Sequence, residues 1–230
     1  MPDVPVHAVQ RGHNKQPVFF DDQDYLEYLR CLKIAADDSA CTVHAYVLMT
    51  NHIHLLLTPV HPESVGQLFQ GVGRNYVSYI NKTYQRRGSL WEGRYKASLI
   101  QTETYFLTCM RYVEMNPVRA KIVDHPAQYR WSSYAANALG ISNAIIKPHE
   151  IYLRLGASLK ERCDAYQGLF QERVDLDRLA AIRNGLRSGT PVGNARFKNQ
   201  IESVAGRKIG KANLGRPALP FPKESDPYKK

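Results

Sequence analysis

Alternating apolar residues mark the strands that the sequence predicts. Residues 4–12 alternate, residues 41–49 and 52–58 are rich in apolar and β-branched side chains, and residues 96–101 form a further short run. Only Thr50 and Asn51 separate the second run from the third, so these two runs are predicted hairpin partners.

Between the strands, apolar residues recur every three or four positions, which predicts helices. One helix runs to about residue 37 with Asp22 or Asp24 as its cap, and a second covers residues 63–84. A third covers residues 103–115, capped by Thr102 and ended by Pro117. The order β-α-β-β-α-β-α predicts an α+β fold, with helices packed on an antiparallel sheet.

The pattern changes beyond residue 140. Residues 141–210 carry short amphipathic helices, and residues 211–230 are basic, rich in proline and predicted to be disordered. We therefore expect three parts: a first domain over residues 1–140, a helical C-terminal extension over 141–210, and a tail over 211–230.

Composition excludes several classes of protein. The 230 residues are 43% hydrophobic and 23% charged, which is typical of a globular chain. No run of about 18 apolar residues exists, so no membrane span is predicted. The first residues lack the apolar region of a signal peptide, and we expect a cytoplasmic location. The four cysteines show no paired spacing, so neither a disulfide framework nor a zinc site is predicted.

Positive charge is concentrated in two zones. The chain has a net charge of +10, of which residues 187–230 contribute +7. The mid-chain zone, residues 71–96, contributes +5, because Glu92 offsets one of its six cations, which are Arg74, Lys82, Arg86, Arg87, Arg94 and Lys96. A polyphosphate partner and a merely solvated basic surface both remain open. Trp91 and Tyr95 lie among these cations and are candidates for base stacking, although Trp91 also fits a core position.

Two histidines interrupt an otherwise apolar strand. His52 and His54 are two residues apart, so they share one face of the strand while Ile53 and Leu55 take the other. Two imidazoles on a rigid strand can hold one metal ion, and phosphate chemistry favours Mg²⁺ or Mn²⁺. The alternative is a pair of surface histidines on the polar face of an edge strand.

The helix over residues 103–115 supplies candidate partners for a metal. Tyr112 and Asn116 are four residues apart and share a face if the helix persists. A free phenol, with a pKa of about 10, is a weak nucleophile that a nearby cation would assist. The alternatives are a packing tyrosine and an asparagine that stops the helix.

Several segments together resemble one family. "TNHIHLLL", "GSLWEGRYKASLI" and "RYVEMNPVRA" are similar to segments of the REP-associated tyrosine transposases of the HUH single-tyrosine group, as are "VHAVQRGHNKQPVFFDD" and "WSSYAA". The resemblance covers residues 4–136 and implies a ferredoxin-like, RRM-like antiparallel sheet. It implies His52 and His54 as metal ligands, Tyr112 as nucleophile, Asn116 as metal helper and Arg11 as a contact to DNA. Tyr105 is the rival nucleophile, outside the matching motif.

The resemblance also implies a reaction. It implies metal-dependent cleavage of single-stranded DNA at a palindromic hairpin, through a covalent 5′-phosphotyrosine link, by a monomer or a dimer. Two alternatives remain: a domesticated protein that binds hairpin DNA without cutting, and a zinc hydrolase using Glu92 or Glu114. The tail motif "LGRPALP" resembles an AT-hook, although a tail of non-specific DNA affinity explains it as well.

Overall fold

The structure is a computed structural model that describes residues 1–171, 175–206 and 208. Its four strands form one antiparallel sheet in the order β2-β3-β1-β4. The strands are β1 Val6–Arg11, β2 Cys41–Met49, β3 His52–Pro59 and β4 Lys96–Leu99. This confirms the predicted hairpin, and the β-α-β-β-α-β connectivity is ferredoxin-like. The predicted tail over 211–230, with its AT-hook-like motif, lies outside the described residues.

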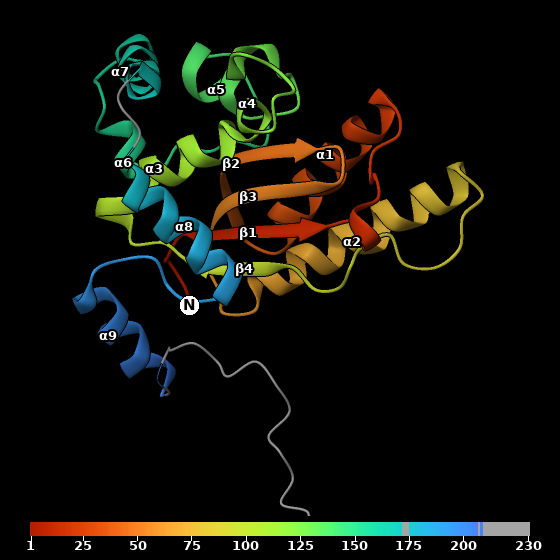
Figure 1. Ribbon diagram of the computed structural model, residues 1–230, viewed down its shortest axis with the longest axis horizontal. Coiled ribbons are helices and arrows are strands. Elements are labelled where there is room, and N and C mark those ends of the chain that lie inside the picture. The colour runs from red at the N-terminus through yellow and green to blue at the C-terminus, as the bar shows by residue number, and fades with distance from the viewer. Residues whose placement is uncertain (172–174, 207, 209–230) are drawn as a thin grey trace, which may run out of the picture.

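Helices cover both faces of the sheet (Figure 1). Helices α1 (Asp22–Asp38) and α2 (Ser64–Thr83) pack on one face, and α3 (Thr102–Glu114) crosses the other. The further helices are α4 Asn116–Arg119, α5 Tyr134–Leu139, α6 Glu150–Leu153, α7 Leu159–Gln171, α8 Leu176–Ser188 and α9 Ala195–Ala205, with the 3-10 turns η1 His13–Lys15 and η2 Pro126–Gln128. No helix in the described part of the chain is long and apolar enough to cross a bilayer.

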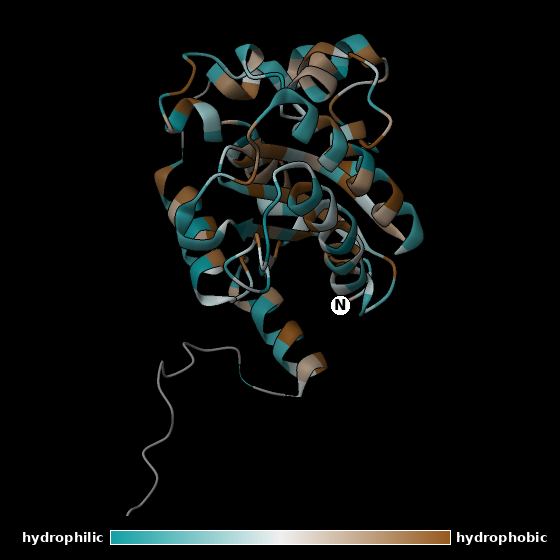
Figure 2. Cartoon of the chain, turned by 90° about the vertical axis from the view of Figure 1, so that its right-hand side faces the viewer, coloured by the Kyte–Doolittle hydropathy of each residue, from teal (hydrophilic) through white to brown (hydrophobic). Residues whose placement is uncertain are grey.

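Alternation along the strands divides the buried residues into two cores. Ile53 and Leu55 lie in the core beneath α1 and α2, whereas Val47 and Leu56 belong to the core beneath α3. The helices are accordingly amphipathic, and Figure 2 shows hydrophobic and hydrophilic residues within the same helix. The face of β3 that carries His52 and His54 is thus the face that α3 covers.

The N-caps of two helices differ from the predictions. Asp21, rather than Asp22 or Asp24, caps α1: its side chain accepts from the Gln23 backbone, and Asp24 completes a capping box. The N-cap of α3 is Gln101, whose side chain makes no capping bond.

Helix α3 also ends earlier than predicted. Its last residue is Glu114, and Pro117 lies in the first turn of the short helix α4. A proline lacks an N–H to donate but fits the first turn of a helix, where donors are unpaired anyway.

The residues after 140 pack on the sheet domain. Tyr166 of α7, Ile182 of α8 and Val192 share one apolar core with α3. Val192 also extends the sheet edge, because its N–H donates to the Leu99 carbonyl at 2.8 Å and its carbonyl accepts from the Gln101 N–H at 2.8 Å. The helical extension therefore covers the β4 edge of the sheet.

A buried carboxyl joins α3 to these helices. Glu114 accepts hydrogen bonds from Ser133 at 2.6 Å, from Asn137 at 2.8 Å and from Tyr166 at 2.8 Å. Burial outweighs these three donors and raises the pKa of Glu114 to about 7. The protonated form is therefore the one that the folded state favours.

We expect Glu114 to make stability fall as the pH rises. Its folded pKa of about 7 exceeds the ordinary value of 4.5, so its contribution is complete below about pH 4.5 and is lost as the pH passes 7. As the pH rises, the free energy of unfolding should fall by roughly 3 kcal/mol more than that of Glu114→Gln, whose side chain does not titrate. Urea unfolding of both proteins between about pH 5 and 8 measures it, and parallel pH profiles would contradict the assignment.

Candidate active site

Strand β3 places two histidines under helix α3. His54 is paired across the strands with Val47 on one side and Val9 on the other, and His52 is paired with Met49 and Arg11. Directly paired residues of antiparallel strands share a face, so all six side chains lie on the side covered by α3. The predicted common face of His52 and His54 is therefore confirmed.

A third histidine, which sequence analysis missed, completes the group. His7 of β1 pairs with Leu56, which places it diagonally beside His54. Its Nε2 lies 2.9 Å from His54 Nδ1, and the two rings stack with centroids 5.2 Å apart. The only hint in the sequence was that His7 alternates with buried Val6 and Ala8. The sequence did not predict the pairing of β1 with β3 that brings His7 to His54.

Hydrogen bonds fix the orientation of the His52 ring. The Asn51 side chain donates to the Lys15 carbonyl at 2.9 Å, which leaves its oxygen to accept from His52 Nδ1 at 2.7 Å. His52 Nδ1 therefore carries the proton, and its Nε2 has a free lone pair. When His54 Nδ1 donates to His7, the Nε2 of His54 is equally free. His7 Nδ1 is buried and has no hydrogen-bond partner within the described structure.

All three imidazoles are neutral at ordinary pH. Burial lowers the pKa of His7 to about 3 and that of His52 to about 4, and it lowers the pKa of His54 well below its usual value. The positive charge of Arg119 adds to the effect at each ring. Neutral imidazole is the form that binds metal.

The donor set fits a divalent cation held by two histidines. Within residues 1–171, 175–206 and 208, no three histidine, cysteine, aspartate or glutamate side chains form a metal-binding group. His7 forms a hydrogen bond with His54, so we assign it as a residue that orients the metal ligand His54 and not as a ligand itself. A metal bound by His52 and His54 would thus need oxygen donors from an amide, water or phosphate, as Mg²⁺ and Mn²⁺ accept.

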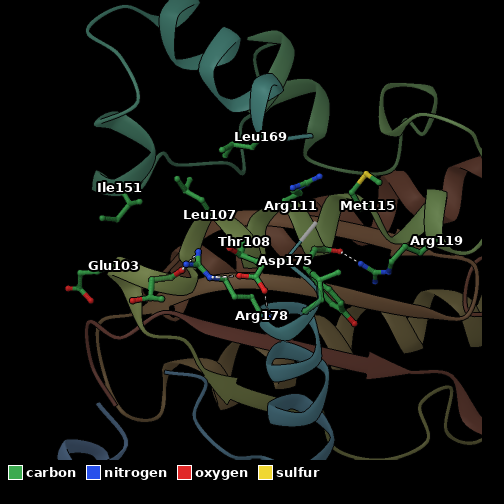
Figure 3. A pocket seen from close by; sticks show the side chains of 13 residues that line it. Glu103, Leu107, Thr108, Arg111, Met115, Arg119, Ile151, Leu169, Asp175 and Arg178 are labelled. Atoms are coloured by element: carbon green, nitrogen blue, oxygen red, sulfur yellow. Dashed lines mark hydrogen bonds and ion pairs between the residues drawn. The ribbon is translucent and has the colours of Figure 1, made fainter. Parts of the chain in front are cut away.

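Tyr112 lies against the histidines. The ring of this α3 residue meets His7 edge-on at a centroid distance of 5.6 Å, and it meets His54 at 6.0 Å. The residue is only 7% exposed and lines a pocket of about 310 Å³ on the outer side of α3 (Figure 3). The structure thus brings together the tyrosine and the histidine pair, although its role as nucleophile stays a prediction.

Arg119 is a second residue that the sequence did not single out. Its guanidinium lies 3.9 Å from the centre of the Tyr112 ring and donates to the Tyr112 carbonyl at 2.8 Å. It also donates to the Asn116 side-chain oxygen at 2.6 Å. The dashed line to Arg119 in Figure 3 is the bond to Tyr112. A partly buried positive charge therefore lies at the candidate nucleophile.

Asn116 lies just beyond the end of α3. It starts α4, and its amide nitrogen donates to the carbonyls of Tyr112 and Val113 at 3.1 and 3.0 Å. One lone pair of its oxygen is used by Arg119, so only the second is free for a metal. Its observed contacts close the end of α3, and metal binding by Asn116 stays a proposal.

The rival residues are placed elsewhere. Tyr105 precedes Tyr112 by seven residues on α3, about 10 Å along the axis, and in the described chain its ring makes no contact with a histidine ring. Glu114 is held by Ser133 and its neighbours in the core. Glu92 is exposed and lies in a pocket with Arg11. The core position of Glu114 removes the support for a zinc hydrolase that uses this glutamate as its acid or base, whereas Glu92 stays an alternative.

The predicted DNA-binding residues divide into two groups. Arg11, Arg94 and Lys96 line one pocket of about 680 Å³ near β1 and β4. Arg74 and Lys82 lie on α2, on the opposite face of the sheet from the histidines. Arg86 and Arg87 follow α2, and the Arg86 guanidinium lies 5.8 Å from the Phe20 ring. The mid-chain zone is therefore not one continuous surface beside the site.

Trp91 corrects a prediction. It is 6% exposed and lies in the α1–α2 core, with its ring 6.3 Å from Tyr28 and 6.4 Å from Tyr76. A buried indole offers no face to a base, so stacking by Trp91 is wrong for this conformation. Tyr95 is partly buried and stacks on Phe69 at 4.2 Å.

Comparison with known proteins bears on the fold and the family. Residues 1–116, half of the chain, match the family model described as "Transposase IS200 like". A solved structure of the REP-associated tyrosine transposase bound to a REP hairpin is 14% identical, with a TM-score of 0.53 over 65% of this chain and 88% of that chain. A putative transposase from Deinococcus radiodurans R1 is 22% identical over 50% of this chain and 91% of its own, with a TM-score of 0.37.

At 14% sequence identity, the match to the first of these structures shows a shared fold and nothing more. No curated protein sequence matches this chain significantly. The family match confirms the resemblance found in the sequence and supports a DNA-processing role. The chain belongs to the family of IS200-like transposases.

Proposed function

We propose that this transposase is a metal-dependent single-stranded DNA endonuclease and strand transferase that acts on palindromic hairpin DNA. One observation supports this above all: Tyr112 meets the rings of His7 and His54, with the Arg119 guanidinium on its ring. A phenol can act as the nucleophile, neutral imidazoles can hold a metal ion, and a partly buried guanidinium can stabilise charge on a phosphate.

His52 and His54 would hold the divalent cation, Mg²⁺ or Mn²⁺. A cation held by these residues would polarise the scissile phosphate and stabilise the charge that develops on its oxygens. His7 and Asn51 act as partners of these ligands, because each engages the Nδ1 of one histidine. Asn116 is the candidate for an additional oxygen ligand.

Tyr112 would carry the chemistry. Its phenol oxygen attacks the phosphorus and forms a P–O bond, while the bond from phosphorus to the 3′ oxygen breaks. The phenol gives up its proton and the 3′ oxygen ends as a hydroxyl, which leaves a 5′-phosphotyrosine link. A 3′-hydroxyl can attack this link in the reverse sense, so strands are exchanged without ATP. Arg119 holds Tyr112 through its carbonyl and its ring, and it offers positive charge to the phosphate.

Hairpin DNA is the proposed partner for two reasons. The fold is shared with a transposase whose structure contains a REP hairpin. The basic pocket with Arg11, Arg94 and Lys96 lies beside β1, the strand that pairs with the histidine strand, where it can take the single-stranded segment that flanks a hairpin.

Tyr112→Phe should abolish covalent adducts and leave DNA binding intact, because only the attacking oxygen is lost. The measurement is a denaturing gel of protein mixed with labelled single-stranded hairpin DNA, with Mn²⁺ or with EDTA. Tyr105→Phe is the matched control and should form the adduct as the natural chain does.

Two results would count against this proposal. An adduct formed by Tyr112→Phe would move the nucleophile to another residue. Binding without any adduct, whichever divalent metal is added, would favour a domesticated protein that holds hairpins without cutting them.

His7 should control metal affinity through His54. His7→Phe removes the partner of His54 Nδ1, and loss of such a partner typically weakens metal binding by about 10–100-fold. His7→Gln keeps a polar partner and should retain more affinity. Electron paramagnetic resonance of free Mn²⁺ measures binding directly, with thermal unfolding as the test of folding. Equal Mn²⁺ affinity in His7→Phe and the natural chain would refute this role.

A further inference from the structure

A basic groove lies beside the candidate active site. Its volume is about 680 Å³, and the apolar side chains of Val9 and Leu186 contribute to its lining. Its cations are Arg11, Lys15, Arg94, Lys96, Arg183 and Arg187. One carboxylate, Glu92, lines it as well.

The groove has two walls from distant parts of the chain. One wall comes from β1, β4 and the turns next to them. The other comes from α8, where Leu186 and Arg187 lie one helical turn after Arg183 and share its side of the helix. Figure 1 shows α8 crossing in front of the sheet, over β1 and β4. Helix α8 follows residue 116, where the family match ends. The second wall is therefore a feature of the C-terminal extension.

Close packing fixes α8 in this position. A Cβ at Gly185 would lie 2.4 Å from Val192 Cγ2 and 2.9 Å from Ser98 Oγ, so only a glycine permits this approach. Ser98 Oγ also donates to the Thr190 carbonyl at 2.6 Å, and Ile182 is fully buried. The arginines of α8 are thus held at a defined distance from β4.

The single carboxylate, Glu92, offsets only a small part of the positive charge of the groove. None of its six cations forms an ion pair among the described residues, and the side-chain bond from Arg187 goes to the neutral amide of Asn184 at 3.2 Å. Cations gathered around a concave surface raise the local concentration of anions. A polyanion is therefore the ligand that this groove would take.

The groove is continuous with the histidine site. Arg11 pairs with His52 across β1 and β3, and Val9 pairs with His54. Arg183 is close enough to Arg119 for its charge to lower the Arg119 pKa. A strand that lies in the groove would therefore pass directly to the histidines and Tyr112.

We infer that this groove binds the sugar-phosphate backbone of single-stranded DNA next to the bond that is cut, and that Arg183 and Arg187 of α8 contact the phosphates from one wall. A groove with cations on both walls and apolar lining suits a single strand, because it can surround one backbone and contact its bases. This inference rests on the proposed function.

The test compares two kinds of DNA and two variants of the full chain. A fluorescent hairpin with a single-stranded extension of about ten nucleotides probes the groove, and the same hairpin with a blunt end does not. Arg183→Gln/Arg187→Gln removes the α8 cations, which are exposed, so folding should persist. Arg196→Gln, on exposed α9, is the matched control. Fluorescence anisotropy at several salt concentrations gives the affinity and its salt dependence.

The double variant should bind the extended hairpin more weakly, with a log–log salt slope shallower by about 1.4, since each phosphate contact to a single strand contributes about 0.7. Its affinity for the blunt hairpin and the behaviour of Arg196→Gln should match the natural chain. An unchanged slope, or equal loss on the blunt hairpin, would overturn the groove while leaving the proposed function intact. Failure of the natural chain to bind either DNA would contradict the proposed function itself.

Discussion

The pairing of β1 with β3 is the constraint on which the site depends. Its register places His7 diagonally beside His54 and Arg11 opposite His52. Because side chains alternate, a slip of one residue would move His7 to the opposite face, into the core beneath α1 and α2. The apolar residues Val6, Ala8 and Ile53 of that core therefore hold the register that assembles the histidines on the other face.

The covering of the second face turns these histidines into a site. Helix α3 buries Tyr112 against them, and Arg119 returns from α4 to pack on the Tyr112 ring and bind its carbonyl. Burial keeps the imidazoles neutral, while the guanidinium of Arg119 keeps positive charge at the phenol. The extension then adds α8, so that residues far apart in the sequence meet at one edge of the sheet.

The sequence predicted what depends on local periodicity. The order of the strands and helices, the hairpin and the common face of the histidine pair follow from spacings within a few residues. His7 and Arg119 were missed because they reach the site through strand register and a turn after α3. For Trp91 the sequence left two positions open, because an aromatic residue among cations fits a core as well as a binding surface, and the structure places it in the core. The place of Arg183 depends on how α8 docks, which no short spacing encodes.

The central claim is that Tyr112 itself becomes linked to DNA, and peptide mapping of the adduct tests it most directly. Trypsin cuts after Arg111 and Arg119, so residues 112–119 form a peptide in which Tyr112 is the only tyrosine, while Tyr105 lies in the preceding peptide. After reaction with single-stranded hairpin DNA and Mn²⁺, mass spectrometry should find the nucleotide phosphate on peptide 112–119. Its appearance on the peptide of Tyr105, or on neither, would contradict the account.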